Sequence, residues 1–308
     1  MNLEQLVRRL AVLVLIFIAA PLSAQMESEQ AEAEQDSPAQ AVLDMLLDFQ
    51  QHPDFWALQV AHDAEEDPDR RRTLAVNIER WRQLPNNLGT RYLMVNIPAF
   101  EVTYWEDGAI IDRRPVIVGT TRTPTPELTT TVTGVVLNPW WEIPASIVAE
   151  SVGALVRNRP SVARARGYVV ENGRYRQRPG PGNALGRTKL VMPNPHSIGL
   201  HDTPNQELFS RDVRAFSHGC VRVSDALDFA TILLSQDAGW SRADVDAVIA
   251  SGQTRTVDLV QPMPVYIAYF TAVPNEVGEI IFHPDIYGRD PRVVVASTAE
   301  QDTECTLG

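Results

Sequence analysis

The chain has 308 residues, of which 44% are hydrophobic and 21% are charged, and this balance excludes a fibrous or wholly disordered protein. The formal net charge of −12 excludes a nucleic-acid partner, because neutralising phosphates requires clustered Lys and Arg. The length allows one large core or two smaller ones.

Residues 1–24 are predicted to be an export signal. Arg8 and Arg9 precede an apolar run from Leu10 to Ala20, and Ala24 ends a small-residue cleavage site. The apolar run is shorter than the roughly 20 residues that a membrane-spanning helix needs. We therefore expect a periplasmic protein that is cleaved after Ala24, with retention as a short membrane anchor as the alternative.

Residues 25–85 are predicted to be an acidic disordered linker followed by a small helical scaffold. The linker, 25–36, has five acidic residues and no basic residue. Within the scaffold, 37–85, both Ser37-Pro38 and Asp67-Pro68 have the form of a helix cap followed by proline in the first turn. We expect two helices that pack against the main domain.

The pattern changes to alternating strands after Asn86. Asp107-Gly108 is a typical hairpin turn between two such strands. Two helices follow later, and Ser241 with Asp244 predicts a capping box at the second. The expected strands are 92–97, 102–105, 110–111, 116–118, 132–137, 198–200, 254–260, 265–271 and 279–282, and the expected helices are 224–234 and 241–250. The fold class is therefore mainly β (α+β), with a catalytic domain over 86–290 and a tail over 291–308.

Residues 138–195 are predicted to be an insertion in this domain. They are rich in Pro, Gly, Arg and Asn, with one helical stretch at 144–156 and one strand-like stretch at 168–170. A plain connection between sheet strands is far shorter. Two interpretations remain open: a lid that caps the substrate, or a small satellite core whose charges are solvated.

Cys220 is the candidate nucleophile. The other cysteine, Cys305, lies in a polar tail, so we do not expect a disulfide, and an unpaired thiol in an exported protein suggests a reactive role. A nearby imidazole or positive charge activates a thiol, and His201, His218 and Arg222 are candidates. A glycine directly before the cysteine allows a tight turn whose amide groups point at a developing oxyanion.

The segment from His201 to Arg222 carries a resemblance to a known family. His201-Asp202-Thr203-Pro204, a spacer, and then Arg214-Ala215-Phe216-Ser217-His218-Gly219-Cys220-Val221-Arg222 resemble the signature of the L,D-transpeptidases with a YkuD-type catalytic domain. Segments at 77–82, 95–100 and 284–288 are similar to the YcbB (LdtD) branch, although no peptidoglycan-binding module is recognisable.

The resemblance implies a YkuD-like β-sandwich or barrel and a role for each matching residue. Cys220 matches the nucleophile and His201 its general base, while Gly219 and His218 belong to the oxyanion turn. The substrate-binding residues would be Arg222, Ser217 and Arg214. No cofactor and no metal are implied, and a zinc site built from His196, His201, His218 and Cys220 is not expected because the spacing matches no compact zinc pattern.

The resemblance also implies the reaction. Peptidoglycan tetrapeptide stems would be donor and acceptor, a Cys thioester the intermediate, and 3,3 cross-links with released D-Ala the products, with covalent carbapenem inhibition. Water as acceptor would make the chain an L,D-carboxypeptidase, and a protein acceptor would make it an anchoring enzyme. A non-catalytic peptidoglycan-binding module is a further alternative. Cell-wall synthesis proteins or anchored outer-membrane proteins are the expected protein partners.

Overall fold

A computed structural model describes residues 51–292 of the chain. The predicted export signal, the acidic linker, the helix after Ser37 and most of the predicted tail lie outside the described residues. Within 51–292, no helix combines the length and the apolar character that crossing a membrane requires.

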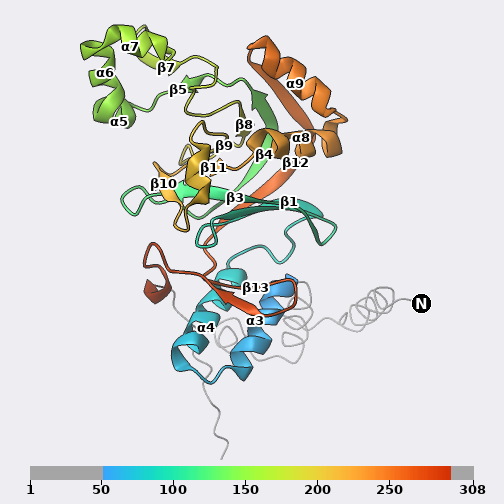
Figure 1. The fold of residues 1–308 in the computed structure, drawn as a ribbon. Helices are drawn as coiled ribbons and strands as arrows, with labels where there is room; N and C mark the ends of the chain where they lie inside the picture. The colour runs from blue at the N-terminus through green and yellow to red at the C-terminus, as the bar shows by residue number, and fades with distance from the viewer. Residues whose placement is uncertain (1–50, 293–308) are drawn as a thin grey trace, which may run out of the picture. The chain divides into compact units, whose positions relative to one another are not determined.

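A nine-stranded sheet organises the described residues (Figure 1), which confirms the mainly β prediction. The strand order is β10-β3-β11-β9-β8-β4-β12-β1-β2, and β3 also pairs with β2, so the sheet closes on itself as a barrel does. The strands are β1 (Arg91–Asn96), β2 (Glu101–Glu106), β3 (Ala109–Gly119), β4 (Leu128–Leu137), β8 (Thr188–Val191), β9 (Leu200–His201), β10 (Ala215–Ser217), β11 (Val221–Val223) and β12 (Arg255–Ala268).

The long strand β3 makes this closure possible. It begins at the predicted turn, where Asp107 and Gly108 both have positive φ, and its first half pairs with β2. Its second half pairs with β11 and β10. The sequence predicted two strands here because the charged stretch 112–114 interrupts the apolar pattern. Those side chains form ion pairs at the sheet surface, such as Arg113 with Glu101 at 2.7 Å, so the ladder continues through them.

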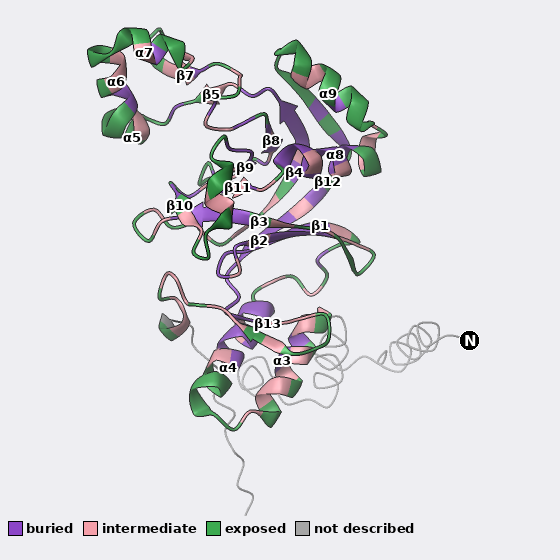
Figure 2. Ribbon diagram, in the orientation of Figure 1, coloured by how far each residue is buried: buried purple, intermediate pink, exposed green. Residues whose placement is uncertain are grey.

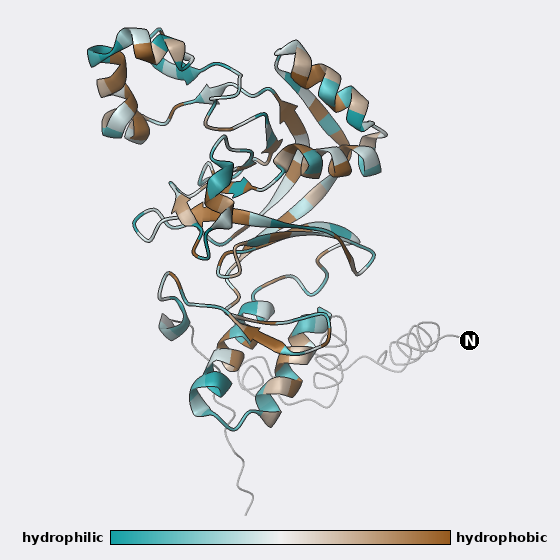
Figure 3. Ribbon diagram, viewed as in Figure 1, coloured by the Kyte–Doolittle hydropathy of each residue, from teal (hydrophilic) through white to brown (hydrophobic). Residues whose placement is uncertain are grey.

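Two hydrophobic clusters lie on opposite faces of β1. Leu93 and Val95 belong to the first cluster, together with helix α8 (Ala226–Ala238). Tyr92 and Met94 belong to the second, together with α3 (Pro53–Ala64) and α4 (Pro68–Arg82). Side chains of a strand alternate between its faces, so one strand serves both clusters. Figure 2 shows much of β1 and β4 as buried and most of α9 as exposed, and Figure 3 shows hydrophobic residues along β4.

The helical part contains α4, which begins at the predicted cap, and α3, which the sequence did not predict. Asp67 caps α4 as expected, and its carboxylate accepts the N–H groups of Asp69 and Arg70. Helix α3 begins after His52, whose ring accepts the N–H of Asp54. Histidine is not among the usual capping residues, so the sequence carried no start signal there. Helix α9 (Arg242–Ser251) has the predicted capping box.

The insertion leaves the main sheet after β4 and returns at β8, so residues 188–191, which were assigned to the insertion, belong to the main sheet. Its helical residues run through α5 (Ala145–Ile147), the π-helical η2 (Val148–Val152), α6 (Gly153–Asn158) and α7 (Pro160–Ala165), and its strands are β5 (Trp141–Glu142), β6 (Tyr168–Glu171) and β7 (Arg174–Gln177). The remaining elements are η3 (Gln206–Ser210), β13 (Ala272–Pro274), β14 (Ile280–Phe282) and η4 (Asp290–Arg292).

Candidate active site

The register between β9 and β11 places Cys220 and His201 on one face of the sheet. These strands are parallel, with Leu200 opposite Val221 and His201 opposite Arg222. Paired residues share a face and successive residues alternate. Leu200 and Val221 are fully buried in the core, so His201 and Arg222 lie on the opposite face. Cys220, which directly precedes Val221, belongs to that face too.

A lysine that the sequence did not single out lies on this same face. Lys189 of β8 pairs with His201 of β9. Lys189 and Arg222 both act electrostatically on the Cys220 thiol and on the His201 ring. Lys189 carries no motif in the sequence, and only the antiparallel pairing of β8 with β9 brings it to the site.

The hydrogen bond of His201 defines its tautomer. Its Nδ1 lies 2.5 Å from the backbone carbonyl oxygen of Asp202. A carbonyl oxygen only accepts, so Nδ1 carries the proton and Nε2 keeps its lone pair. Burial lowers the pKa of His201 to about 4, against the opposing effect of the Asp202 carbonyl. The imidazole is therefore neutral at pH 7 and is able to take a proton at Nε2.

Asp202 is itself held in place. Its Oδ2 accepts the backbone N–H of Arg187 at 2.7 Å, and its Oδ1 accepts a bond from Gln206 Nε2 at 3.2 Å. Gly186 has φ of 62°, and a Cβ there would lie 2.3 Å from the Asp202 carboxyl carbon. The carbonyl that orients His201 therefore belongs to a residue whose own side chain is fixed by hydrogen bonds and by close packing against Gly186.

The Cys220 thiol is free and half-buried. Its Sγ lies 3.9 Å from the carbonyl oxygen of Ser197. Burial raises the pKa of Cys220, while the Gly199 backbone and the nearby cations Arg222 and Lys189 oppose that rise. A thiol whose pKa is raised and an imidazole whose pKa is lowered are both mainly neutral near pH 7, so nucleophilic attack by this sulfur would require transfer of the thiol proton to a base.

The turn that contains Cys220, residues 217–220, is held by Ser217. Its Oγ donates to the carbonyl oxygen of Cys220 at 2.5 Å and accepts the N–H of Gly219 at 3.0 Å. The predicted oxyanion donor at Gly219 is therefore engaged inside the turn. The N–H of Cys220 donates to no other group within residues 51–292 and is the remaining donor. Ser217 is only 2% exposed, so its hydroxyl holds the turn and is not presented to a substrate.

Two other predicted site residues contact protein groups away from the thiol. His218 is exposed, and its Nε2 lies 2.9 Å from a carboxylate oxygen of Glu150 in η2, which links the turn to the insertion. The guanidinium of Arg214 donates to the backbone carbonyls of Phe100, Val116 and Arg211. Arg214 therefore braces the β3 region, whereas Arg222 remains beside the thiol.

No group of three or more His, Cys, Asp and Glu side chains that could hold a metal ion occurs in the described range 51–292. Trp140 in the insertion lies under the guanidinium of Arg176, 4.3 Å from its ring centroid. This contact is part of the packing within the insertion.

Comparison with known proteins identifies the family. The family model for the L,D-transpeptidase catalytic domain (YkuD) matches residues 90–267, which is more than half of the chain. A Haemophilus influenzae protein named "Putative L,D-transpeptidase" is 34% identical over 244 residues, which cover 72% of this chain and 49% of that protein. The chain belongs to the L,D-transpeptidase (YkuD) family. It spans about half the length of the curated relative that it matches, and the comparisons do not support the narrower YcbB assignment.

Solved structures of the family were also found. An L,D-transpeptidase from Mycobacterium smegmatis is 16% identical, with a TM-score of 0.33 and coverage of 57% of this chain and 58% of that chain. The catalytic domain of an Enterococcus faecium L,D-transpeptidase acylated by ertapenem is 12% identical, with a TM-score of 0.32 and coverage of 59% and 98%. At these TM-scores the matches add nothing to the assignment, which rests on the family model and the relative.

Proposed function

We propose that this chain is an L,D-transpeptidase that acts on peptidoglycan tetrapeptide stems through a Cys220 thioester. The thiol sulfur attacks the carbonyl that joins diaminopimelate to D-Ala, and the thiol proton passes to His201 Nε2. When the C–N bond breaks, that proton goes to the leaving amine of D-Ala. The amine of a second stem then attacks the thioester and gives its proton to His201, and the thiol is restored with a 3,3 cross-link formed.

The observation that carries this proposal is the shared face of β9 and β11. A half-buried thiol and a neutral imidazole, whose Nδ1 proton is held by the Asp202 carbonyl, project from the same face of these two neighbouring strands, which supports the proposal. That is the arrangement that a thiol nucleophile with a general base needs. No other free cysteine lies within residues 51–292.

The charge of this face supports an anionic peptide substrate. Lys189 and Arg222 lie there although the chain as a whole has a net charge of −12. A tetrapeptide stem ends in the D-Ala carboxylate and carries a further carboxylate on diaminopimelate. Two cations beside the thiol are suited to hold such a peptide with its scissile carbonyl near the sulfur.

Product analysis tests the proposal. The purified chain is incubated with a defined tetrapeptide muropeptide, with and without a second stem, and the products are identified by mass spectrometry. Cross-linked dimer with D-Ala release is expected, and Cys220→Ala should abolish both. Cys305→Ala is the matched control and should retain activity. D-Ala release that survives in Cys220→Ala contradicts the nucleophile assignment, and tripeptide without dimer indicates an L,D-carboxypeptidase.

Covalent labelling separates an enzyme from a binding module. We expect imipenem to add to the wild-type chain at Cys220 and not to Cys220→Ala, as intact-protein mass spectrometry would show. Muropeptide binding without labelling or turnover would favour the non-catalytic module. A protein linked to the stem through its amine would instead indicate the anchoring enzyme.

The proposed substrate places the reaction in the periplasm, as the predicted signal does. Fractionation of cells that express the full chain and N-terminal sequencing of the mature protein test this directly. We expect the mature chain to begin after Ala24, and a protein that keeps residues 1–24 would instead be anchored. The likeness to YcbB stays a prediction, which a comparison of full-length relatives would test.

A further inference from the structure

One loop holds the outer carbonyls of the catalytic turn. This bracing loop, residues 119–125, follows β3. The carbonyl oxygen of Ser217 accepts the N–H of Thr120 at 3.0 Å and a hydrogen bond from Thr123 Oγ1 at 3.1 Å. The carbonyl oxygen of Gly219 accepts a hydrogen bond from Thr125 Oγ1 at 2.8 Å. Thr125 is fully buried, so water does not compete for this bond.

The hydroxyl of Tyr287 closes the bracing loop. It donates to the carbonyl oxygen of Gly119 at 2.6 Å and accepts the N–H of Thr125 at 3.3 Å. The Thr125 hydroxyl in turn accepts the N–H of Gly119 at 2.8 Å. The ends of the loop are so close that a Cβ on Gly119 would lie 2.1 Å from the carbonyl oxygen of Thr123. One phenol oxygen therefore bridges both ends of the loop that holds the catalytic turn.

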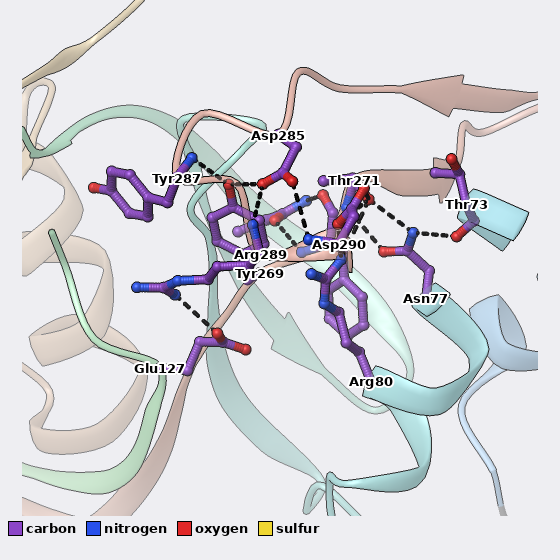
Figure 4. Close-up of polar contacts among 12 residues, drawn as sticks. Thr73, Asn77, Arg80, Glu127, Tyr269, Thr271, Asp285, Tyr287, Arg289 and Asp290 are labelled. Carbon is purple, nitrogen blue, oxygen red and sulfur yellow. Dashed lines mark hydrogen bonds and ion pairs between the residues drawn. The ribbon is translucent and has the colours of Figure 1, made fainter. Parts of the chain in front are cut away.

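Tyr287 is fixed by the residues around it (Figure 4). Its N–H donates to the hydroxyl of Tyr269 at 2.8 Å, and the two rings stack at a centroid distance of 5.7 Å. The hydroxyl of Tyr269 donates to the carboxylate of Asp285 at 2.6 Å. Arg289 lies over both rings and donates to the carbonyl of Thr125 at 3.0 Å. The position of the phenol hydroxyl is thus set by the segment 285–290.

The same segment is anchored on the helical scaffold. Arg80 of α4 forms an ion pair with Asp290 at 2.7 Å, and Arg80 is only 5% exposed. Asn77 of α4 accepts the N–H of Thr271 at 2.8 Å, and the Thr271 hydroxyl contacts the Asp290 carboxylate. The N–H of Asp290 also donates to the Asp285 carboxylate at 2.9 Å, so a continuous set of polar contacts runs from α4 to the Gly219 carbonyl. Much of this set lies outside residues 90–267, the range that the family model matches.

The geometry of one peptide unit connects this network to the reaction. The Gly219 carbonyl and the Cys220 N–H belong to the same planar trans peptide, so they point in opposite directions. Fixing the carbonyl on Thr125 therefore fixes the direction of the Cys220 N–H. Gly219 has φ of 110°, a conformation that side-chain-bearing residues rarely adopt, so the turn depends on such external bonds.

We propose that Thr125 and Tyr287 are positioning residues for acyl transfer, which hold the Gly219–Cys220 peptide so that the Cys220 N–H stabilises the oxyanion of the tetrahedral intermediate. The inference rests on the proposed function. Neither side chain contacts the substrate in this mechanism. Both act on the direction of a donor, which matters only in a step where negative charge develops on the substrate oxygen.

The test compares two reactions of the same thiol in the full chain. Imipenem acylates the sulfur through a tetrahedral oxyanion, whereas iodoacetamide alkylates it by displacement without one. We expect Thr125→Val and Tyr287→Phe to lower the second-order rate of imipenem acylation by about tenfold or more, somewhat less than removal of an oxyanion donor. Alkylation by iodoacetamide should stay within about twofold of wild type, because the sulfur and its base are unchanged.

Tyr266→Phe is the matched control. It removes a buried tyrosine hydroxyl that donates to the Leu88 carbonyl at 3.1 Å, in the second hydrophobic cluster. Both of its rates should stay near wild type. Acylation at the wild-type rate in Tyr287→Phe and Thr125→Val would overturn the proposal, and so would an equal loss in both reactions. A wild-type thiol that is alkylated yet never acylated by imipenem or a tetrapeptide would instead reject the proposed function, and the positioning role with it.

Discussion

Acid should destabilise this protein through a buried neutral histidine. Burial lowers the pKa of His201 to about 4, from 6.5 for the exposed group. Below pH 6.5 His201 becomes protonated in the unfolded chain but stays neutral in the folded chain until the pH approaches 4. The free energy of unfolding therefore decreases as the pH falls from 6.5 to about 4. This difference in pKa corresponds to roughly 3 kcal/mol from His201.

Two neighbouring groups in the helical part act in opposite directions over the same range. Burial also lowers the pKa of His52 to about 4, which adds a loss of the same sign. Burial raises the pKa of Asp54 to about 6. As the pH falls, the folded chain therefore protonates Asp54 before the unfolded chain does. This increases the free energy of unfolding between pH 6 and about 4. The two effects nearly cancel, so His201 dominates the expected loss.

Urea unfolding followed by circular dichroism at pH 7, 6, 5 and 4.5 measures this loss. His201→Gln should flatten the pH dependence, whereas His62→Gln, at a half-buried site on α3, is the control and should retain it. Equal slopes for wild type and His201→Gln would refute the reasoning. The same pKa predicts that kcat/KM for D-Ala release stays high down to about pH 5. A half-maximal point near 6.5 would show that the imidazole is not desolvated as the structure indicates.

Three substitutions test other contacts. Ser217→Ala leaves the part-buried Cys220 carbonyl and the buried Gly219 N–H without their partner, so we expect a loss of roughly 2–4 kcal/mol in urea unfolding and slower imipenem acylation. An unchanged midpoint would contradict the turn geometry. Gly186→Ala places a Cβ against Asp202 at a backbone position with left-handed φ. The Asp202 carbonyl that orients His201 should be displaced, so kcat/KM should fall. A normal kcat/KM would argue against that role of the carbonyl. Glu150→Gln alters an exposed contact with His218, so stability should change by less than about 1 kcal/mol while proteolysis within the insertion accelerates. A large loss of stability would show that the contact is stronger than its exposure suggests.

Local features of the fold followed from short sequence patterns. Asp67-Pro68 predicted the start of α4, Asp107-Gly108 predicted the hairpin turn, and Ser241 predicted a capping box. Each depends on contacts within a few residues, so the sequence contains the whole cause. The unpredicted helix α3 shows the limit of this reasoning, because its cap is a histidine whose ring reaches the Asp54 N–H.

The sequence by itself determined the family, which the match over residues 90–267 confirms. A cysteine between glycine and valine at a family-like distance from a histidine also predicted a thiol nucleophile, which the experiments above would test. Only the tertiary structure decided which groups surround it. Lys189 reaches the site through the pairing of β8 with β9, and Tyr287 reaches the catalytic turn through the bracing loop. Pairings between residues far apart in the chain depend on strand register and core packing, which no local pattern encodes. For the same reason, the tautomer of His201 and the engaged N–H of Gly219 became visible only in the folded chain.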